Sequence, residues 1–114
     1  MVASAHRYVP EKGDVVWINF DPQAGHEQAG RRPAVILSLG SYNGPTGLAL
    51  LCPVTSQAKG YPYEVPLPAG APVTGVVLAD HFKSFDWRVR RASYVGVVGQ
   101  DVLDQILDRL ASIL

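Results

Sequence analysis

The chain has 114 residues, of which 47% are hydrophobic and 18% are charged, and its ten basic residues balance ten acidic ones. A chain of this length is expected to form one domain, residues 1–114, and to bury roughly 65% of the surface that its unfolded form exposes. The zero net charge excludes a molecule-wide attraction to nucleic acid or membranes, so any nucleic-acid site must be a local patch.

The single cysteine, Cys52, excludes an internal disulfide and favours a reducing compartment. It lies in the apolar run LALLCPV, which is typical of a buried and unreactive thiol. The first 14 residues hold no apolar core of signal-peptide length, and no window approaches about 18 apolar residues. We therefore expect a cytoplasmic protein without a membrane segment.

Short runs of β-forming residues follow one another along the chain, separated by turn residues. The first predicted strand is GDVVWINF (13–20), and PAVILSL (33–39) is a continuous apolar run that we expect to be buried on both faces. Pro53 places part of its strand at an edge or a bulge. The further predicted strands are 48–56, 63–67, 76–80 and 94–99, and the predicted loops and turns are 21–32, 40–47, 57–62 and 68–75.

The final segment, QDVLDQILDRLASIL (100–114), changes to a helical period. Its apolar residues recur at intervals of three and four, which predicts a helix that packs one stripe against the rest of the domain. The stripe consists of Leu103, Ile106, Leu107, Leu110, Ile113 and Leu114. The pattern as a whole predicts a mainly β domain, either a small curved barrel or a sandwich, closed on one side by this C-terminal helix.

Three groups of polar residues stand where predicted strands start or stop, so one rim of a barrel could collect all of them. The groups are His26, Glu27, Gln28, Arg31 and Arg32; Thr55, Ser56, Gln57, Lys59 and Tyr61; and Asp80, His81, Lys83, Trp87, Arg88 and Arg90. No two histidines have metal-ligand spacing, so the sequence predicts no metal site, and it contains no phosphate-binding glycine motif that would indicate a nucleotide cofactor.

Taken singly, each group also has a plain structural interpretation. The two arginines could be charged gatekeepers of an apolar strand, and Thr55 and Ser56 could cap a turn. The segment WRVRR could be a solvated strand with Trp87 and Val89 inward, and Tyr61 could serve loop packing alone.

Together, the groups suit the cleavage of RNA by its own 2′-hydroxyl. That reaction requires a base for the 2′-OH, a proton for the leaving 5′-oxygen, and donors for the oxygens on phosphorus. Arginine suits the third role because its guanidinium binds two phosphate oxygens at once. Aromatic and guanidinium planes suit unstacked single-stranded bases.

Three blocks of the sequence, GDVVWINFDPQAGHEQAGRRPAVILS, PVTSQAKGYPYEV and GVVLADHFKSFDWR, closely resemble the MazF/PemK family of toxins from toxin–antitoxin pairs. The resemblance runs from about Gly13 to the terminal helix, in the order and spacing of the family. It implies an SH3-like curved β-barrel of the PemK/CcdB type that works as a homodimer. It also implies a metal-independent, sequence-specific endoribonuclease that cuts single-stranded RNA, usually mRNA, and leaves 2′,3′-cyclic phosphate and 5′-hydroxyl ends. A small antitoxin of the MazE type would block the RNA groove with an extended acidic segment.

The resemblance also implies roles for individual residues. The catalytic arginine of the family falls on Arg32, its catalytic threonine on Thr55, and the acidic residue of the first loop on Glu27. His26 matches a histidine that contributes to the site in the PemK branch, and Asp80 matches an aspartate which that branch uses as a base.

One position departs from the PemK pattern. That branch has an arginine two residues before the aspartate, and this chain has Leu78 there. The PemK-type acid/base pair is therefore in doubt, and the arrangement around Arg32 and Thr55 is favoured. The general base stays open among Glu27, His26 and a water positioned by the backbone.

The remaining polar residues are assigned to RNA contacts. They are Gln28, Arg31, Ser56, Gln57, Lys59, Tyr61, Asp80, Lys83 and Arg88. Two interpretations of other classes remain. One is a non-enzymatic toxin of the same fold that binds and poisons a topoisomerase through a C-terminal helix with aromatic residues, although the terminal helix here ends in aliphatics. The other is a barrel-type adaptor without toxicity, which would need neither Arg32 nor Thr55.

Overall fold

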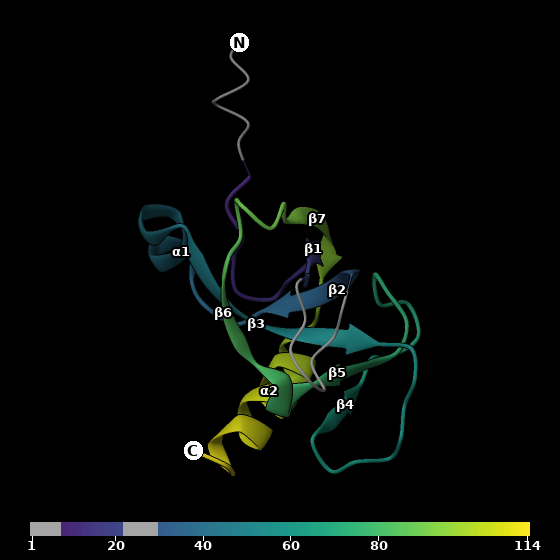
Figure 1. Ribbon diagram of the computed structural model, residues 1–114. Coiled ribbons are helices and arrows are strands. Elements are labelled where there is room, and N and C mark those ends of the chain that lie inside the picture. The colour runs from purple at the N-terminus through teal and green to yellow at the C-terminus, as the bar shows by residue number, and fades with distance from the viewer. Residues whose placement is uncertain (1–7, 22–29) are drawn as a thin grey trace.

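The computed structural model describes residues 8–21 and 30–114, and within these ranges the protein is a curved antiparallel sheet with two helices (Figure 1). The elements are β1 (Asp14–Asn19), β2 (Arg31–Ile36), α1 (Gly40–Thr46), β3 (Leu48–Thr55), β4 (Glu64–Pro66), β5 (Val76–Leu78), η2 (Ala79–His81), β6 (Lys83–Asp86), β7 (Ser93–Val97) and α2 (Gln100–Ala111). The prediction of a mainly β domain with a C-terminal helix is confirmed.

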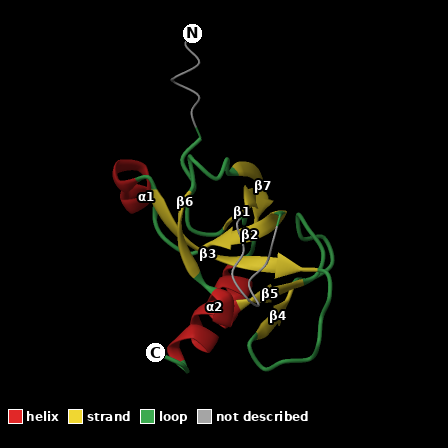
Figure 2. Cartoon of the chain, in the orientation of Figure 1, coloured by secondary structure: helices red, strands yellow, loops and turns green. Residues whose placement is uncertain are grey.

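The strands are hydrogen-bonded in the order β4-β5-β3-β2-β1-β7, and β6 pairs with β3 outside this path. Within the described part of the chain this path does not close, so the sheet is strongly curved rather than a complete barrel. β3 is the central strand, because it pairs with β2 along one side and with β6 and then β5 along the other. Figure 2 shows α1 and α2 at opposite sides of the sheet.

Pro53 lies inside β3, and the strand continues past it to Thr55. On one side of β3, residues 48–51 pair with β6 and residues 54–55 pair with β5. Pro53 therefore lies between the stretch that pairs with β6 and the stretch that pairs with β5. A proline disturbs the hydrogen-bond ladder least where one ladder has ended and the next has not begun.

Two hydrophobic cores lie on the two faces of this sheet. The first is formed between the sheet and α2, from which Val102, Leu103, Ile106 and Leu110 are buried. The second fills the concave side formed by β1, β2, β3 and β6, where Phe20 and Phe85 meet edge to face with ring centroids 5.1 Å apart. The inner half of β2, from Ala34 to Ile36, is buried on both faces as its apolar sequence predicts. The strand ends at Ile36 rather than at residue 39, and Leu39 is 55% exposed, so the predicted strand 33–39 was too long at this end.

The predicted bounds of the C-terminal helix and of the second strand need correction. The helix α2 ends at Ala111, and Ile113 and Leu114 are 44% and 87% exposed, so they do not extend the buried stripe. The strand β2 begins at Arg31, two residues before the predicted start, because Arg31 and Arg32 pair with Asn19 and Ile18 of β1. The first loop is therefore shorter than the predicted range 21–32, and most of that loop lies outside the described residues.

Residues 40–47, predicted as a turn, form the helix α1 instead, because long-range contacts outweigh the weak helical propensity of GSYNGPT. Asn43 is fully buried, and its side-chain amide donates to the carbonyls of Pro10 (2.8 Å) and Ser38 (2.9 Å). The Asn43 side-chain oxygen accepts from the Ser38 hydroxyl (2.6 Å), and its backbone carbonyl accepts from the Trp87 indole (2.8 Å). Of these partners, Pro10 and Trp87 are distant in the sequence, so no local pattern could indicate them.

The segment WRVRR is also different from the strand considered above. The strand β6 spans Lys83–Asp86 and was missed, and residues 87–91 form turns. Trp87 is buried there, whereas Val89 is 76% exposed. The carboxylate of Asp86 accepts from the backbone N–H groups of Arg88 and Val89, which is the hydrogen bonding of a turn rather than of a strand.

Among the described residues, no helix is both long enough and apolar enough to cross a membrane.

Candidate functional site

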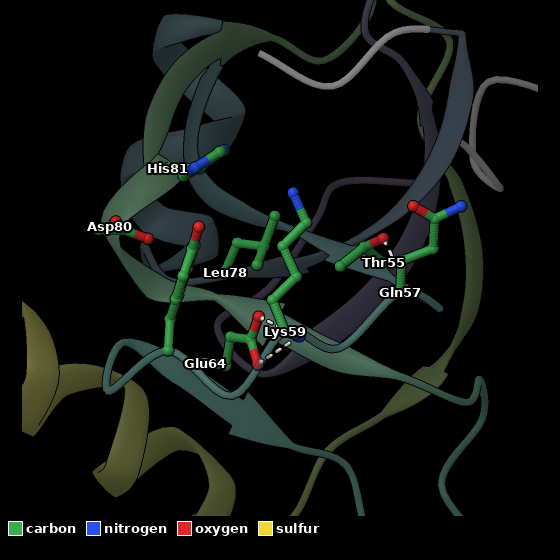
Figure 3. Close-up of a pocket in the computed structure, with 8 residues that line it drawn as sticks. Thr55, Gln57, Lys59, Glu64, Leu78, Asp80 and His81 are labelled. Carbon is green, nitrogen blue, oxygen red and sulfur yellow. Dashed lines mark hydrogen bonds between the residues drawn. The ribbon is translucent and has the colours of Figure 1, made fainter. Parts of the chain in front are cut away.

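A pocket of about 470 Å³ opens at the end of β3, and three separate segments of the chain form its walls (Figure 3). Its lining residues are Thr55, Gln57, Lys59, Tyr61, Glu64, Leu78, Asp80 and His81. Strand pairing brings the segments together, because β5 lies between β3 and β4 with Thr55 opposite Val76 and Glu64 opposite Leu78. Four of the five residues of the second predicted polar group therefore meet two of the six residues of the third, Asp80 and His81.

Thr55 is the last residue of β3 and is buried, with 8% of its surface exposed. Its side-chain oxygen accepts a hydrogen bond from the backbone N–H of Gln57 at 3.2 Å. A threonine hydroxyl that accepts in this way can still donate its own proton. Thr55 therefore caps the turn, as its plain structural interpretation predicts. Its hydroxyl proton remains able to form a hydrogen bond to a bound group.

Gly75 packs directly behind Thr55. A Cβ atom added to Gly75 would lie 2.2 Å from the Thr55 carbonyl oxygen, and the backbone φ of Gly75 is +124°, a conformation that L side chains rarely adopt. Only glycine therefore allows the start of β5 to approach the end of β3 this closely, and the position of Thr55 depends on that approach.

Arg32 lies on the neighbouring strand, at the exposed end of β2. β2 and β3 pair in the register Ala34 to Pro53 and Val35 to Cys52, and Arg32 and Thr55 each lie two residues beyond the pair Ala34 and Pro53. Arg32 and Thr55, to both of which the family resemblance assigns catalysis, are therefore at the same end of the β2–β3 pair.

Arg32 lines a second hollow, of about 580 Å³, on the other side of the end of β3. This hollow is lined by Trp17, Arg31, Arg32, Pro33, Val54, Ser56, Pro72, Val73 and Thr74. Because successive residues of a strand point to opposite faces, Val54 and Ser56 line this hollow while Thr55 lines the first. The end of β3 thus forms the wall between two adjacent hollows.

Arg31 and Arg88 have structural contacts of their own. A terminal nitrogen of Arg31 donates to the carbonyl of Arg91 (2.8 Å) and to the Ser93 hydroxyl (3.0 Å). Arg88 donates to the carbonyl of Gly44 at 2.9 Å and lies 4.6 Å from the centre of the Trp87 ring. The structure does not bring Arg88 to either hollow, and RNA contact by this residue stays a prediction.

Lys83 is at the start of β6, opposite Leu51, and does not line either hollow. His26, Glu27 and Gln28 lie outside the described residues, so the predictions for them are not tested by the structure. Among the residues that the structure describes, no three of the metal-ligating types gather at one point.

Sequence reasoning missed two charged or polar residues of the pocket. The first is Glu64, the first residue of β4, which is buried with 8% of its surface exposed. Its carboxylate accepts hydrogen bonds from backbone N–H groups of the preceding loop. The second is His81, which was noted in the third polar group but assigned no role, and which ends η2 beside Asp80. A glycine turn followed by an acidic residue, as in KGYPYE, is the signal that could have indicated Glu64.

Cys52 is next to the pocket but takes no part in it. It is fully buried, and its thiol donates to the carbonyl of Ala79 at 3.7 Å. Burial, with a smaller contribution from the negative charge of Asp80, raises the pKa of Cys52 to about 12. The thiol is therefore protonated and unreactive at neutral pH, as its apolar sequence context predicts.

Comparison with known proteins identifies relatives along nearly the whole chain. Residues 11–114 match the family described as PemK-like, MazF-like toxin of type II toxin-antitoxin system. The chain is 52% identical over 100 residues to the endoribonuclease toxin MazF of Escherichia coli strain K12, covering 88% of this chain and 89% of the relative.

Solved structures give the same result. A crystal structure of MazF from Deinococcus radiodurans superposes with a TM-score of 0.91 at 59% identity, covering 94% of this chain and 97% of the other. A MazE–MazF structure from the same organism superposes with a TM-score of 0.86, also at 59% identity, covering 94% and 96% of the two chains. The curved fold expected from the resemblance is thus confirmed.

Proposed function

The chain belongs to the PemK-like, MazF-like family of type II toxin–antitoxin toxins, and we propose that it is itself the toxin of such a pair and acts as an endoribonuclease. Relatives at 52% identity carry the name endoribonuclease toxin MazF, and the chain covers 89% of their length. The observation that supports the proposal in this chain is that Arg32 and Thr55 lie at the same end of the paired strands β2 and β3, each two residues beyond the pair Ala34 and Pro53.

The proposed reaction is an attack by a 2′-hydroxyl of the RNA on its own adjacent phosphate. A base removes the 2′-OH proton, the 2′-oxygen–phosphorus bond forms, and the phosphorus–O5′ bond breaks as the leaving oxygen takes up a proton. The products are a 2′,3′-cyclic phosphate and a 5′-hydroxyl. These steps use proton transfer and charge stabilisation alone, so we propose that the reaction is independent of metal ions.

Arg32 and Thr55 supply the charge stabilisation. Arginine keeps its positive charge at physiological pH and offers a planar set of donors to phosphate oxygens, so Arg32 acts as the electrostatic clamp. The Thr55 hydroxyl donates to a non-bridging oxygen, while its own oxygen is held by the N–H of Gln57. Tyr61, 59% exposed at the pocket, offers a ring on which an unpaired base can stack.

The general base is open among His26, Glu27 and a water. A pH–rate profile tests the histidine: a rising limb at about pH 6–7 supports His26 as the base, and one at about pH 4–5 excludes it.

The partners follow from the family. We propose that the protein binds a cognate MazE-like antitoxin, since a structure of MazE–MazF from Deinococcus radiodurans matches this chain at 59% identity. We also propose that the chain forms a homodimer and works in the cytoplasm, where its single buried cysteine needs no oxidising environment.

The test is an incubation of the purified protein with a long single-stranded RNA, and with DNA of the same sequence, both in excess EDTA. Discrete RNA fragments with cyclic-phosphate ends, absent for DNA, support the proposal. An Arg32→Ala variant should leave the RNA intact, whereas Lys12→Ala, which removes an equal charge from an exposed site outside both hollows, should cleave like the wild type. Intact RNA with folded wild type would favour the topoisomerase-binding toxin instead.

A further inference from the structure

The carboxylate of Glu64 is bound by the backbone of the loop that precedes it. Its two oxygens accept from the N–H of Lys59 at 3.0 and 3.2 Å, and one of them also accepts from the N–H of Gly60 at 3.0 Å (Figure 3). The Glu64 backbone N–H donates in turn to the carbonyl of Tyr61 at 3.1 Å. One residue thus closes the loop with both its side chain and its main chain.

We propose that Glu64 is a positioning residue that holds the loop 57–62 in the shape in which its side chains can bind RNA. This inference rests on the proposed function, since it concerns the RNA-binding wall of the same site. Gln57, Lys59 and Tyr61 are the loop residues that line the pocket, and Figure 3 shows the Lys59 side chain rising across it between His81 and Thr55.

The loop has little else to fix its shape. Its sequence, QAKGYP, lies between β3 and β4 outside both strands, and residues 57–62 are exposed. Gly60 has φ +80°, and an added Cβ would meet nothing within 4 Å, so the loop faces open space at this residue. At the far end of the loop, the Arg109 guanidinium of α2 donates to the carbonyl of Pro62 at 3.1 Å.

A carboxylate is suited to this task for a physical reason. Two successive backbone N–H groups that point the same way form a concave site for an anion. The Glu64 carboxylate is the anion that occupies this site. Its position is fixed because Glu64 pairs with Leu78 of β5. Ala79, the first residue of η2, follows Leu78 and donates from its N–H to the carbonyl of Tyr63 at 3.1 Å. Glu64 therefore sets the loop at a fixed distance from the turn that carries Asp80 and His81.

Removing the carboxylate should affect binding more than folding. The N–H groups of Lys59 and Gly60 are in an exposed loop, so water can replace the lost acceptor, and the cost of burying a charge disappears with the charge. A loop that is not pre-ordered must instead be ordered when RNA binds, and this lowers affinity. Arg32 and Thr55 are carried by β2 and β3, so the bond-breaking step should keep its rate.

The experiment compares Glu64→Ala and Glu64→Gln with the wild type. In Glu64→Ala, KM for a long single-stranded transcript should rise about tenfold with kcat unchanged, because a hydrogen bond to a charged acceptor contributes about a factor of ten to an equilibrium. The affinity for a 2′-O-methyl RNA oligonucleotide of mixed sequence, which lacks the attacking hydroxyl, should fall by the same factor. Glu64→Gln keeps one acceptor oxygen and should rescue most of the loss, with a KM about threefold above the wild type.

Two further measurements separate positioning from a general loss of stability. Amide hydrogen exchange at Lys59 and Gly60 should accelerate in Glu64→Ala while exchange in β3 stays unchanged. The matched control is Glu11→Ala, which removes a carboxylate that accepts from the N–H groups of Gly40 (2.8 Å) and Lys12 (3.0 Å) on another part of the molecule. This control should leave KM unchanged.

Several outcomes would overturn the inference. They are an unchanged KM in Glu64→Ala, a fall in kcat without a rise in KM, unaltered exchange at Gly60, or a Glu64→Ala protein that is unfolded at 25 °C. If the wild type leaves RNA intact, the proposed function fails by itself, and exchange at Gly60 alone decides whether Glu64 holds the loop.

Discussion

Replacing Gly75 by alanine tests whether the close approach of β5 to β3 sets the position of Thr55. The new Cβ would lie 2.2 Å from the Thr55 carbonyl oxygen. An ordinary carbon–oxygen contact is about 3.3 Å, so the two backbones must separate by about 1 Å. Overpacking of this kind costs about 1–3 kcal/mol, and a left-handed backbone at a residue with a Cβ costs about 1–2 kcal/mol more. We therefore expect a destabilisation of about 3 kcal/mol, which lowers Tm by about 10–20 °C.

The same displacement should reduce cleavage beyond the loss of stability. Misplacing a catalytic group by about 1 Å lowers the rate by about 100-fold, so kcat should fall by that order at a temperature well below Tm. The control is Gly70→Ala, where φ is +89° but an added Cβ meets nothing within 4 Å. That variant carries backbone strain without the clash, and should lose a few degrees of Tm and no activity. If Gly75→Ala and Gly70→Ala melt and cleave alike, the close approach to Thr55 has no functional importance.

Three further predictions concern the core, the buried ionisable groups and RNA binding. Ile106→Ala, which empties a fully buried position of α2, should lower the free energy of unfolding by about 3 kcal/mol in a urea titration, whereas Gln105→Ala on the same helix should change it by less than about 0.5 kcal/mol. Burial raises the pKa of Cys52 to about 12, and burial and Asp14 raise that of Tyr8 above its usual range. Both groups keep their protons in the folded state at a pH at which the unfolded chain releases them. The free energy of unfolding should therefore be highest below about pH 8.5 and fall as the pH rises above it. Cys52→Ala should remove the part of this fall that occurs below about pH 10, and a free energy of unfolding that does not change with pH in this range in the wild type would contradict the assignment. Lys83→Ala should weaken RNA binding and reduce its salt slope by roughly one phosphate contact, and an unchanged slope removes Lys83 from the RNA-binding residues.

The sequence alone predicts those elements whose cause is local. Each apolar run from GDVVWINF onward became a strand because burial of a continuous or alternating apolar segment needs no distant information. The helix α2 was predicted for the same reason, since its period of three and four residues is visible within the segment.

The features that were missed depend on distant residues. α1 forms around Asn43, whose partners Pro10 and Trp87 are 33 and 44 residues away. The placing of Arg32 and Thr55 at the same end of the β2–β3 pair follows from a strand register, which no local pattern specifies, although the family resemblance had assigned catalysis to both residues. The role of Glu64 depends on which way two backbone N–H groups point, and this is a property of the folded loop.

Asn43 is followed by Gly44, and this Asn-Gly dipeptide is a site of chemical deamidation. Asn-Gly is the dipeptide in which the backbone nitrogen of glycine most easily attacks the asparagine side chain, because glycine offers no steric hindrance, and the product is a succinimide that opens to aspartate or isoaspartate. In the folded chain the Asn43 side chain is held away from that reaction by its bonds to Pro10 and Ser38, and the helix keeps Gly44 in place. A molecule in which this corner opens is exposed to an irreversible change, since a carboxylate cannot donate to the Pro10 carbonyl as the amide did. The fraction of isoaspartate at position 43 in a stored sample therefore measures how often Asn43 loses its hydrogen bonds to Pro10 and Ser38.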